Sequence, residues 1–236
     1  MPPPPPKSAV IREPSRHPVR YLVWDLPLRL FHWGLVASVC VSLYTMKTQG
    51  APFAFPQTVH AQAGLVGLGL LMFRWGWLIC GSRHSRARDW LTGPRVAGRY
   101  AGALLRRRPP PYAAHNPLGG WAVMAMLVSL TLQALTGLFL SDDVFFDAPL
   151  HTTVPSAVSD LLLGIHHVNG QVVIVLIVLH LTALVAHRLL GERLVGAMVT
   201  GRKAVEPRED EALTGVAGAE ESADWWWKAL LLASAS

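Results

Sequence analysis

The stretch VVIVLIVLH, residues 172–180, places a histidine directly after eight consecutive apolar residues. It belongs to a longer segment, residues 161–187, that contains no Asp, Glu, Lys or Arg. A hydrocarbon core about 30 Å thick is crossed by roughly 20 predominantly apolar helical residues. We therefore expect this segment to span a membrane. Its histidines are expected to be functional, because ionisable groups inside a bilayer are costly.

Three more apolar segments have a similar length: residues 28–45, 59–80 and 119–140. Helices buried in a soluble bundle normally keep a charged face, and these segments have none. With short connections on one side, they predict an all-α, integral membrane four-helix bundle with up-down-up-down order. The residues expected to cap these helices are Asp25 for the first, Thr58 for the second, and Ser159 or Asp160 for the fourth.

Positive charge is divided unevenly between the two sides of this bundle. Of the 21 Lys and Arg residues, only Lys47 falls on the side whose second connection contains Asp142, Asp143 and Asp147. The positive-inside rule then places both termini and the connection 81–118 in the cytoplasm. The net charge of +6 is explained by this topology and by contact with membrane lipid, so no nucleic-acid partner is expected.

The two ends of the chain differ in composition from its centre. Residues 1–20 are rich in proline and predict a disordered tail, not a secretory signal, because the first apolar segment starts late. Residues 204–236 form an acidic tail with three consecutive tryptophans near its end. The transmembrane domain is predicted to occupy residues 21–203. Cys40 and Cys80 form no CxxCH motif, which excludes covalent haem attachment.

Histidines in the predicted spans fall at two depths. Because the helices alternate in direction, His32 and His180 lie near the cytoplasmic side, and we name them the inner layer. His60 and His166 lie near the opposite side and form the outer layer. His166 and His180 are about 21 Å apart along a helix and within about 40° of one face. We therefore predict that His32 faces His180 and that His60 faces His166.

Two imidazoles that face each other across a bundle suit the axial positions of haem iron. The two layers thus predict two non-covalent haem b groups, with the four histidines as ligands of the iron. A zinc site would need three or four ligands at one depth, and neither layer provides them. The spans contain no interior Asp or Glu, which counts against a proton-coupled transporter.

Two other histidines lie close to these ligands in the same span. His167 competes with His166 as the outer ligand, but it is about 140° off the face of His180, so His166 is favoured. His187 shares the face of His180 and lies beside Arg188 at the helix end. A histidine there interacts favourably with the helix dipole, and we assign it no iron.

Two arginines lie near the inner layer. Arg74 is 14 residues after His60 in the second span, and Arg29 precedes His32 in the first. Each either binds a haem propionate as part of the cofactor site or extends to the lipid headgroups. Gln133 in the third span is expected to form a hydrogen bond between helices, with a quinone contact as the alternative.

Several motifs resemble the bacterial cytochrome b561 family, which includes the b-type cytochrome subunit of nickel-iron hydrogenases. They are VWDLPLRLFHW at 23–33, FRWGWLICGSRHSR at 73–86, HNPLGGW at 115–121, LQALTGLF at 132–139, and the IHH and LH histidines of 165–180. The resemblance covers roughly residues 21–203. It implies the same four haem ligands: His32, His60, His166 and His180. The chain departs from the family pattern at His167, where members often carry an acidic residue.

These observations predict a di-haem b-type cytochrome of the bacterial inner membrane that carries electrons between the quinone pool and a redox partner. The resemblance implies a hydrogenase, another periplasmic oxidoreductase or a cytochrome c as that partner. No catalytic residue is assigned, so the chain is either an electron-transfer subunit or a quinone oxidoreductase. The alternatives are a self-contained quinone reductase with a small diffusible donor such as superoxide, a histidine-lined metal or ion transporter, and a structural membrane anchor. Homo-oligomer formation is left open.

Overall fold

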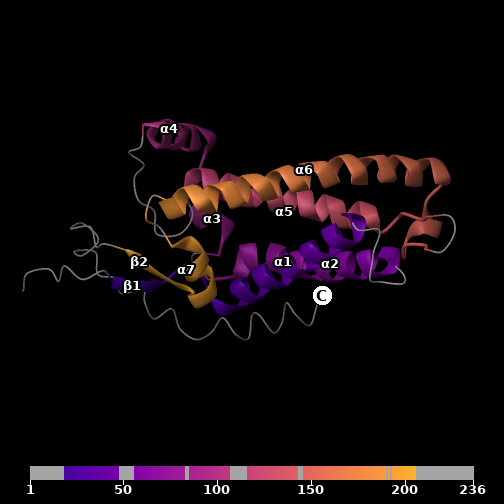
Figure 1. Cartoon of the computed structure of the whole chain (residues 1–236), viewed down its shortest axis with the longest axis horizontal. Coiled ribbons are helices and arrows are strands. Elements are labelled where there is room, and N and C mark those ends of the chain that lie inside the picture. Colours follow the sequence, from indigo (N-terminus) through magenta and orange to yellow (C-terminus); the bar gives the residue numbers. More distant parts are fainter. Residues whose placement is uncertain are drawn as a thin grey trace, which may run out of the picture.

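The computed structural model describes residues 19–47, 56–82, 85–106, 116–142, 146–189, 191 and 193–205. Four long helices run along the longest axis of the molecule (Figure 1): α1 (Leu26–Lys47), α2 (Pro56–Cys80), α5 (Pro117–Gly137) and α6 (Ser156–Leu189). All four are long and apolar enough to cross a membrane. The predicted all-α membrane four-helix bundle is confirmed, and each helix begins before its predicted span.

The start of α1 is set by Asp25. Its Oδ1 accepts a hydrogen bond of 2.8 Å from the backbone N–H of Leu28, and Pro27 occupies the first turn, where its missing N–H costs nothing. α5 starts in the same manner, because the side chain of Asn116 accepts a hydrogen bond of 2.7 Å from the N–H of Gly119. The predicted cap at Asp25 is therefore confirmed.

The predicted caps of the second and fourth helices are wrong. α2 begins at Pro56 and α6 at Ser156, directly after Pro155, so both helices start further toward the N-terminus than expected. Proline is well suited to a first helical turn, which explains why the helices extend this far. Thr58 and Ser159 consequently lie inside helices, and the Ser159 hydroxyl instead donates to the carbonyl of Phe139 at 2.9 Å.

The four helices pack as an open chain of neighbours. α1 packs on α2, α2 on α5, and α5 on α6, whereas among the described residues α1 and α6 make no packing of similar extent. Buried apolar side chains join the packed helices, among them Leu71, Leu127 and Val173. The bundle therefore has an open seam between its first and fourth helices.

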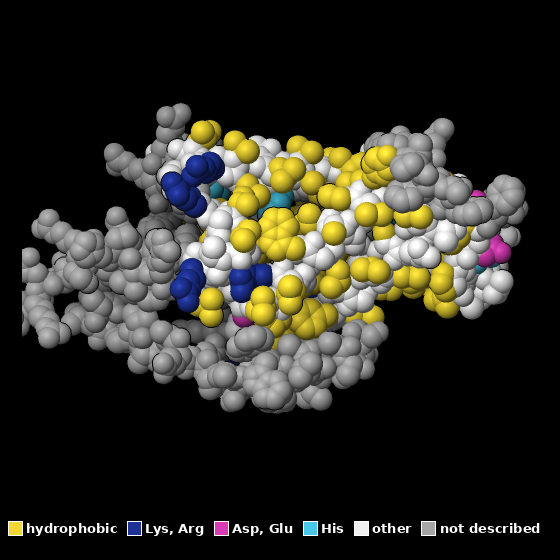
Figure 2. All heavy atoms as spheres, turned by 60° about the horizontal axis from the view of Figure 1, so that its bottom comes forward, with side chains coloured by type: hydrophobic (Ala, Val, Ile, Leu, Met, Phe, Trp, Pro, Cys, Tyr) yellow, Lys and Arg dark blue, Asp and Glu magenta, His cyan; other side chains and the backbone are white. Residues whose placement is uncertain are grey.

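Apolar side chains also cover the outside of the bundle. Figure 2 shows them along its flank, with the basic side chains toward one end and most of the visible acidic ones at the other. On α6 the exposed apolar residues include Val168, Val172, Val175, Leu179 and Val185. A soluble monomer rarely exposes so continuous an apolar surface, whereas a transmembrane helix presents one to lipid.

Five short elements gather at the end where α1 starts and α6 ends (Figure 1). They are β1 (Val19–Leu22), α3 (Ala87–Trp90), α4 (Pro94–Leu105), α7 (Leu194–Thr200) and β2 (Arg202–Val205). The strands pair antiparallel, with Val19 opposite Val205 and Leu22 opposite Arg202. This small ladder was not expected from the sequence. It includes the last residues of the predicted N-terminal tail and the first of the C-terminal tail, whose remainders lie outside the described residues.

We name β1, β2 and α7 the terminal clamp, because they fasten the start of α1 to the chain that follows α6. The carbonyl of Gly201 accepts hydrogen bonds from the N–H groups of Val23 and Trp24, at 2.8 and 3.2 Å. Nη1 of Arg29 donates to the carbonyl of Val199 at 2.6 Å. Gly201 ends α7 with a positive φ of 78°, and a Cβ there would lie 2.7 Å from the Trp24 carbonyl oxygen. Glycine is therefore required at this turn.

Candidate functional site

His60 of α2 and His166 of α6 meet at one level of the bundle. Their ring centroids are 6.2 Å apart, and the ring planes are inclined by 72°. His166 is buried, with 8% of its surface exposed, and His60 is half-buried. The structure thus brings together the two histidines of the outer layer, from helices that are distant in sequence.

Hydrogen bonds at Nδ1 orient both of these rings. Nδ1 of His60 lies 3.1 Å from the carbonyl oxygen of Ser42 and 3.3 Å from Oγ1 of Thr45. Because a carbonyl oxygen only accepts, Nδ1 carries the proton and Nε2 keeps its lone pair. Nδ1 of His166 lies 3.1 Å from Oγ1 of Thr136. This is the arrangement of metal-binding histidines, whose other nitrogen is held by an oxygen of the protein.

A cavity of about 650 Å³ surrounds the outer layer and is lined by residues of α1, α2, α5 and α6. Sites for cofactors and ligands typically measure about 300–1,000 Å³. Glycines shape its walls: a Cβ at Gly137 would lie 3.4 Å from the His166 ring, whereas one at Gly64 would meet nothing within 4 Å. Gly64 and Gly170 follow His60 and His166 by four residues. Because glycine has no side chain, the helix surface leaves free space next to each histidine.

The distance between the His60 and His166 ring centroids can be compared with the distance expected for two imidazoles that bind one metal atom. A metal–imidazole bond is about 2.0–2.1 Å long, and adding about 1.1 Å from each nitrogen to its ring centre places the two centroids about 6.3 Å apart. The observed distance is 6.2 Å. Together with the cavity, this distance means that the residues present fit a haem iron with two axial histidines.

His32 of α1 and His180 of α6 are also neighbours, close enough for their imidazoles to interact electrostatically. Both side chains are half-buried. Nδ1 of His32 is buried and has no hydrogen-bond partner in the described part of the chain. Buried polar atoms are nearly always hydrogen-bonded, so this ring has binding capacity that the protein's own described groups do not use. The pairing predicted for the inner layer is therefore compatible with the structure.

The two alternative histidines occupy different surroundings. His167 is exposed and lines the same cavity, with its ring centroid 6.4 Å from that of His166. His187 lies near the start of α5, with Nε2 3.4 Å from Nδ2 of Asn116. Within the described residues, no group of three or more His, Cys, Asp or Glu side chains is arranged to hold a metal ion.

The two predicted propionate ligands make contacts to the protein. Arg74 is only 2% exposed, and its Nη1 donates to the carbonyl of Ser85 at 3.1 Å. Its side chain does not extend to the surface, so the structure does not show Arg74 reaching the lipid headgroups. Arg29 donates to the terminal clamp, as described above. For both arginines, binding to a propionate stays a prediction.

A polar cluster around Asp25 was missed by the sequence reasoning. The carboxylate is 6% exposed, and its Oδ2 accepts hydrogen bonds from Trp77 Nε1 at 3.0 Å, from Ser85 Oγ at 2.9 Å and from Ser82 Oγ. Arg74 interacts with it electrostatically. An acidic residue at the start of a span, with serines just after the next span, was the available signal. We name these five residues the Asp25 cluster.

Hydrogen bonds between α5 and α6 centre on Asn169. Its Nδ2 donates to Oε1 of Gln133 at 2.7 Å and to the carbonyl of Ser129 at 2.9 Å, and its Oδ1 accepts from Ser129 Oγ at 2.9 Å. The predicted helix–helix hydrogen bond of Gln133 is confirmed. Asn169 itself was overlooked, although a polar side chain inside an apolar span is a recognisable signal.

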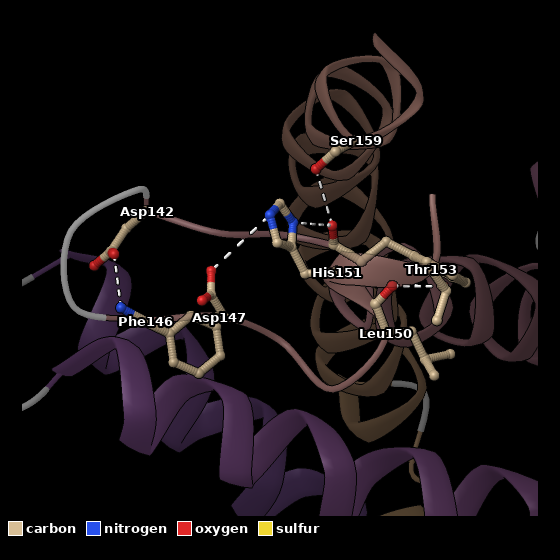
Figure 3. Close-up of polar contacts among 8 residues, drawn as sticks. Asp142, Phe146, Asp147, Leu150, His151, Thr153 and Ser159 are labelled. Atoms are coloured by element: carbon tan, nitrogen blue, oxygen red, sulfur yellow. Dashed lines mark hydrogen bonds and ion pairs between the residues drawn. The ribbon is translucent and has the colours of Figure 1, made fainter. Parts of the chain in front are cut away.

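The connection between α5 and α6 covers the outer end of the cavity, and Ser141, Asp142, Phe146 and Pro149 contribute to the lining. Figure 3 shows its internal contacts. The N–H of Phe146 donates to Oδ1 of Asp142 at 2.7 Å, and Nε2 of His151 lies 4.0 Å from Oδ1 of Asp147. The opposite end of the bundle from the terminal clamp is therefore closed by an acidic connection.

Comparison with known proteins identifies the family of the chain. The family model of prokaryotic cytochrome b561 matches residues 23–201, so the chain belongs to that family. It is a membrane b-type cytochrome, a class whose cofactor is haem b. The chain is similar to two proteins named "Probable Ni/Fe-hydrogenase 1 B-type cytochrome subunit", from Escherichia coli strain K12 and from Escherichia coli O157:H7.

Each of these relatives is 24% identical over an alignment of 151 residues, and the match covers 55% of this chain. The match spans 64% of the length of each relative. No solved structure matches the chain.

Proposed function

We propose that the chain carries single electrons through the bacterial inner membrane, between the quinone pool and a redox partner protein, by way of two haem b groups. The observation that carries this proposal is the outer layer: two buried or half-buried imidazoles 6.2 Å apart beside a cavity of about 650 Å³. The inner layer supplies the second pair. His32 and His180 lie on α1 and α6, the two helices that border the open seam.

The geometry of α6 supports a path across the membrane. α6 runs without interruption from Ser156 to Leu189 and carries one ligand of each layer. Its histidines, 14 residues apart, are about 21 Å apart along the helix axis. One helix thus sets the spacing of both proposed haems.

The chain's own groups hold and tune the ligands. When bound, haem supplies the one-electron chemistry through its iron. The Ser42 carbonyl and the Thr136 hydroxyl orient the outer imidazoles, and hydrogen bonding at Nδ1 raises the basicity of Nε2. Apolar helix faces keep water from the site, so nearby charges act strongly on the iron.

Charge supports the proposed orientation and partners. The end with α3, α4 and the terminal clamp carries the arginines that the positive-inside rule places in the cytoplasm. The acidic connection between α5 and α6 then faces the periplasm. The relatives' names indicate a hydrogenase as one class of partner, and another periplasmic oxidoreductase or a cytochrome c would meet the same outer surface. No specific observation favours the superoxide-dependent alternative.

A spectrum with a haem count tests the proposal. Full-length protein purified in detergent from haem-supplemented cells should show a b-type reduced-minus-oxidised spectrum, about two haems per chain, and reduction by a quinol. His180→Ala should remove the inner haem alone and His60→Ala the outer haem alone, with His151→Ala as a control that keeps both. A colourless wild-type protein, or retention of both haems in His180→Ala, would refute it.

A further inference from the structure

Two opposite charges are buried together at the clamp end of the bundle. Asp25 is 6% exposed and Arg74 is 2% exposed, and the two interact electrostatically. Ser85 connects them, because its carbonyl accepts from Arg74 Nη1 at 3.1 Å while its hydroxyl donates to Asp25 Oδ2 at 2.9 Å. A buried charge is costly unless it is paired and hydrogen-bonded, and here both conditions are met.

The hydrogen bonds of Asp25 join the start of α1 to the end of α2. Trp77 Nε1 donates from the last turns of α2, and the hydroxyls of Ser82 and Ser85 donate from the connection that follows it. The same carboxylate caps α1 through the N–H of Leu28. One side chain therefore sets both the height and the rotation of α1 relative to α2.

This anchoring acts on His32. Asp25 precedes His32 by seven residues, which is about 10.5 Å along the helix and within about 20° of the same face. α1 does not pack extensively on α6, the helix that carries His180. The spacing of the inner layer therefore depends on how α1 is held by α2 and by the terminal clamp.

We propose that Asp25 and Arg74 form a balanced charge pair that positions His32 and adds no net charge of its own beside the inner haem. The inference rests on the proposed function, because it requires a haem at the inner layer. A cation alone at this place would favour the reduced iron, and an anion alone would favour the oxidised iron. Paired, they cancel, and the reduction potential of the inner haem is set by its ligands and its burial.

Redox titration of both haems tests the pair in Asp25→Asn, Arg74→Gln and the double variant. The inner haem's ratio of reduced to oxidised iron is measured at the wild-type midpoint. A unit charge about 10 Å away, at an effective dielectric constant of about 20, changes this ratio about tenfold. We expect about a tenfold rise in Asp25→Asn, about a tenfold fall in Arg74→Gln, and a ratio near the wild-type value in the double variant. The outer haem should stay unchanged in all three.

Ser82→Ala is the matched control, since it removes one hydrogen bond to the carboxylate but keeps both charges. It should leave the ratio within about twofold of wild type, less than the 59 mV that a tenfold change represents for one electron. Shifts of the same sign in both single variants, or no shift, would show that the pair has only a structural role and would overturn the inference.

Poor assembly of the single variants would also give an answer. A lone buried charge is strongly destabilising, whereas removal of both partners is much better tolerated. Haem content in membranes should then recover in the double variant, and an equal loss in all three would overturn the inference. A wild-type protein without an inner haem would refute the proposed function. Two haems without opposite shifts would refute this inference alone.

Discussion

Replacing His166 with alanine is expected to remove the outer haem, whereas the same change at His167 is expected to leave it bound. The two residues are adjacent on α6 but differ in their surroundings. His166 is 8% exposed, and its Nδ1 lies 3.1 Å from the Thr136 hydroxyl. His167 is exposed. Adjacent residues point about 100° apart around a helix, so only one of them faces His60.

The size of the effect follows from the geometry of the pair. The ring centroids of His60 and His166 are 6.2 Å apart, close to the separation that one bridging iron requires. Alanine at 166 would remove one of the two imidazoles proposed to hold the iron and would leave His60 without a partner. The haem content should fall from about two to about one per chain, and the b-type α-band should lose about half its amplitude.

The assay is a haemochrome determination on purified full-length variants, normalised to protein concentration. Added imidazole should partly restore the outer haem in His166→Ala, because the space left by the ring can accept a free imidazole. The His167→Ala protein should match wild type with and without imidazole. Loss of a haem from His167→Ala together with an intact His166→Ala would show that the ligand assignment is wrong.

Three further changes test the supports of the site. Gly201→Ala places a Cβ 2.7 Å from the Trp24 carbonyl at a φ of 78°, so we expect a loss of about 1–2 kcal/mol or more, measured by thermal unfolding in detergent. Asn169→Leu removes three hydrogen bonds between α5 and α6, and at roughly 0.6 kcal/mol each it should lower stability by about 2 kcal/mol in the same assay. Thr136→Val removes the contact to His166 and should weaken outer haem binding about tenfold in a haem titration, with the inner haem unaffected.

Much of the fold could be predicted because hydropathy and length are local properties of the sequence. The four spans, their alternating direction and the depth of each histidine follow from them. The ends of the helices were less accurate: α6 extends to 34 residues, since a helix can continue past the hydrocarbon region where composition no longer marks it. Which helices are neighbours depends on packing across the bundle, and the open seam between α1 and α6 was therefore not foreseen.

The candidate site divides in the same way. The structure brings His60 and His166 together, as expected from the depths that spacing along helices gives them, and their role as a pair of haem ligands stays a prediction. The role of Asp25 as a hub could not be derived, since its partners Trp77 and Ser85 follow it by 52 and 60 residues. Only the fold brings the end of α2 and the next connection onto the start of α1. The same holds for Arg74: the sequence predicted its depth in the membrane but not its contacts with Ser85 and Asp25.

The terminal clamp has a consequence for how the protein is made. Val19 of β1 pairs with Val205 of β2, so the ladder joins the chain before α1 to the chain after α7. During synthesis β1 has no partner strand until β2 has been made, and β2 follows all four membrane helices in the chain. The start of α1 is therefore not fastened to the chain after α6 until β2 has been synthesised. Pairing of β1 with β2 is then a late step of folding, and it holds the start of α1 near the end of α6 without closing the seam between them.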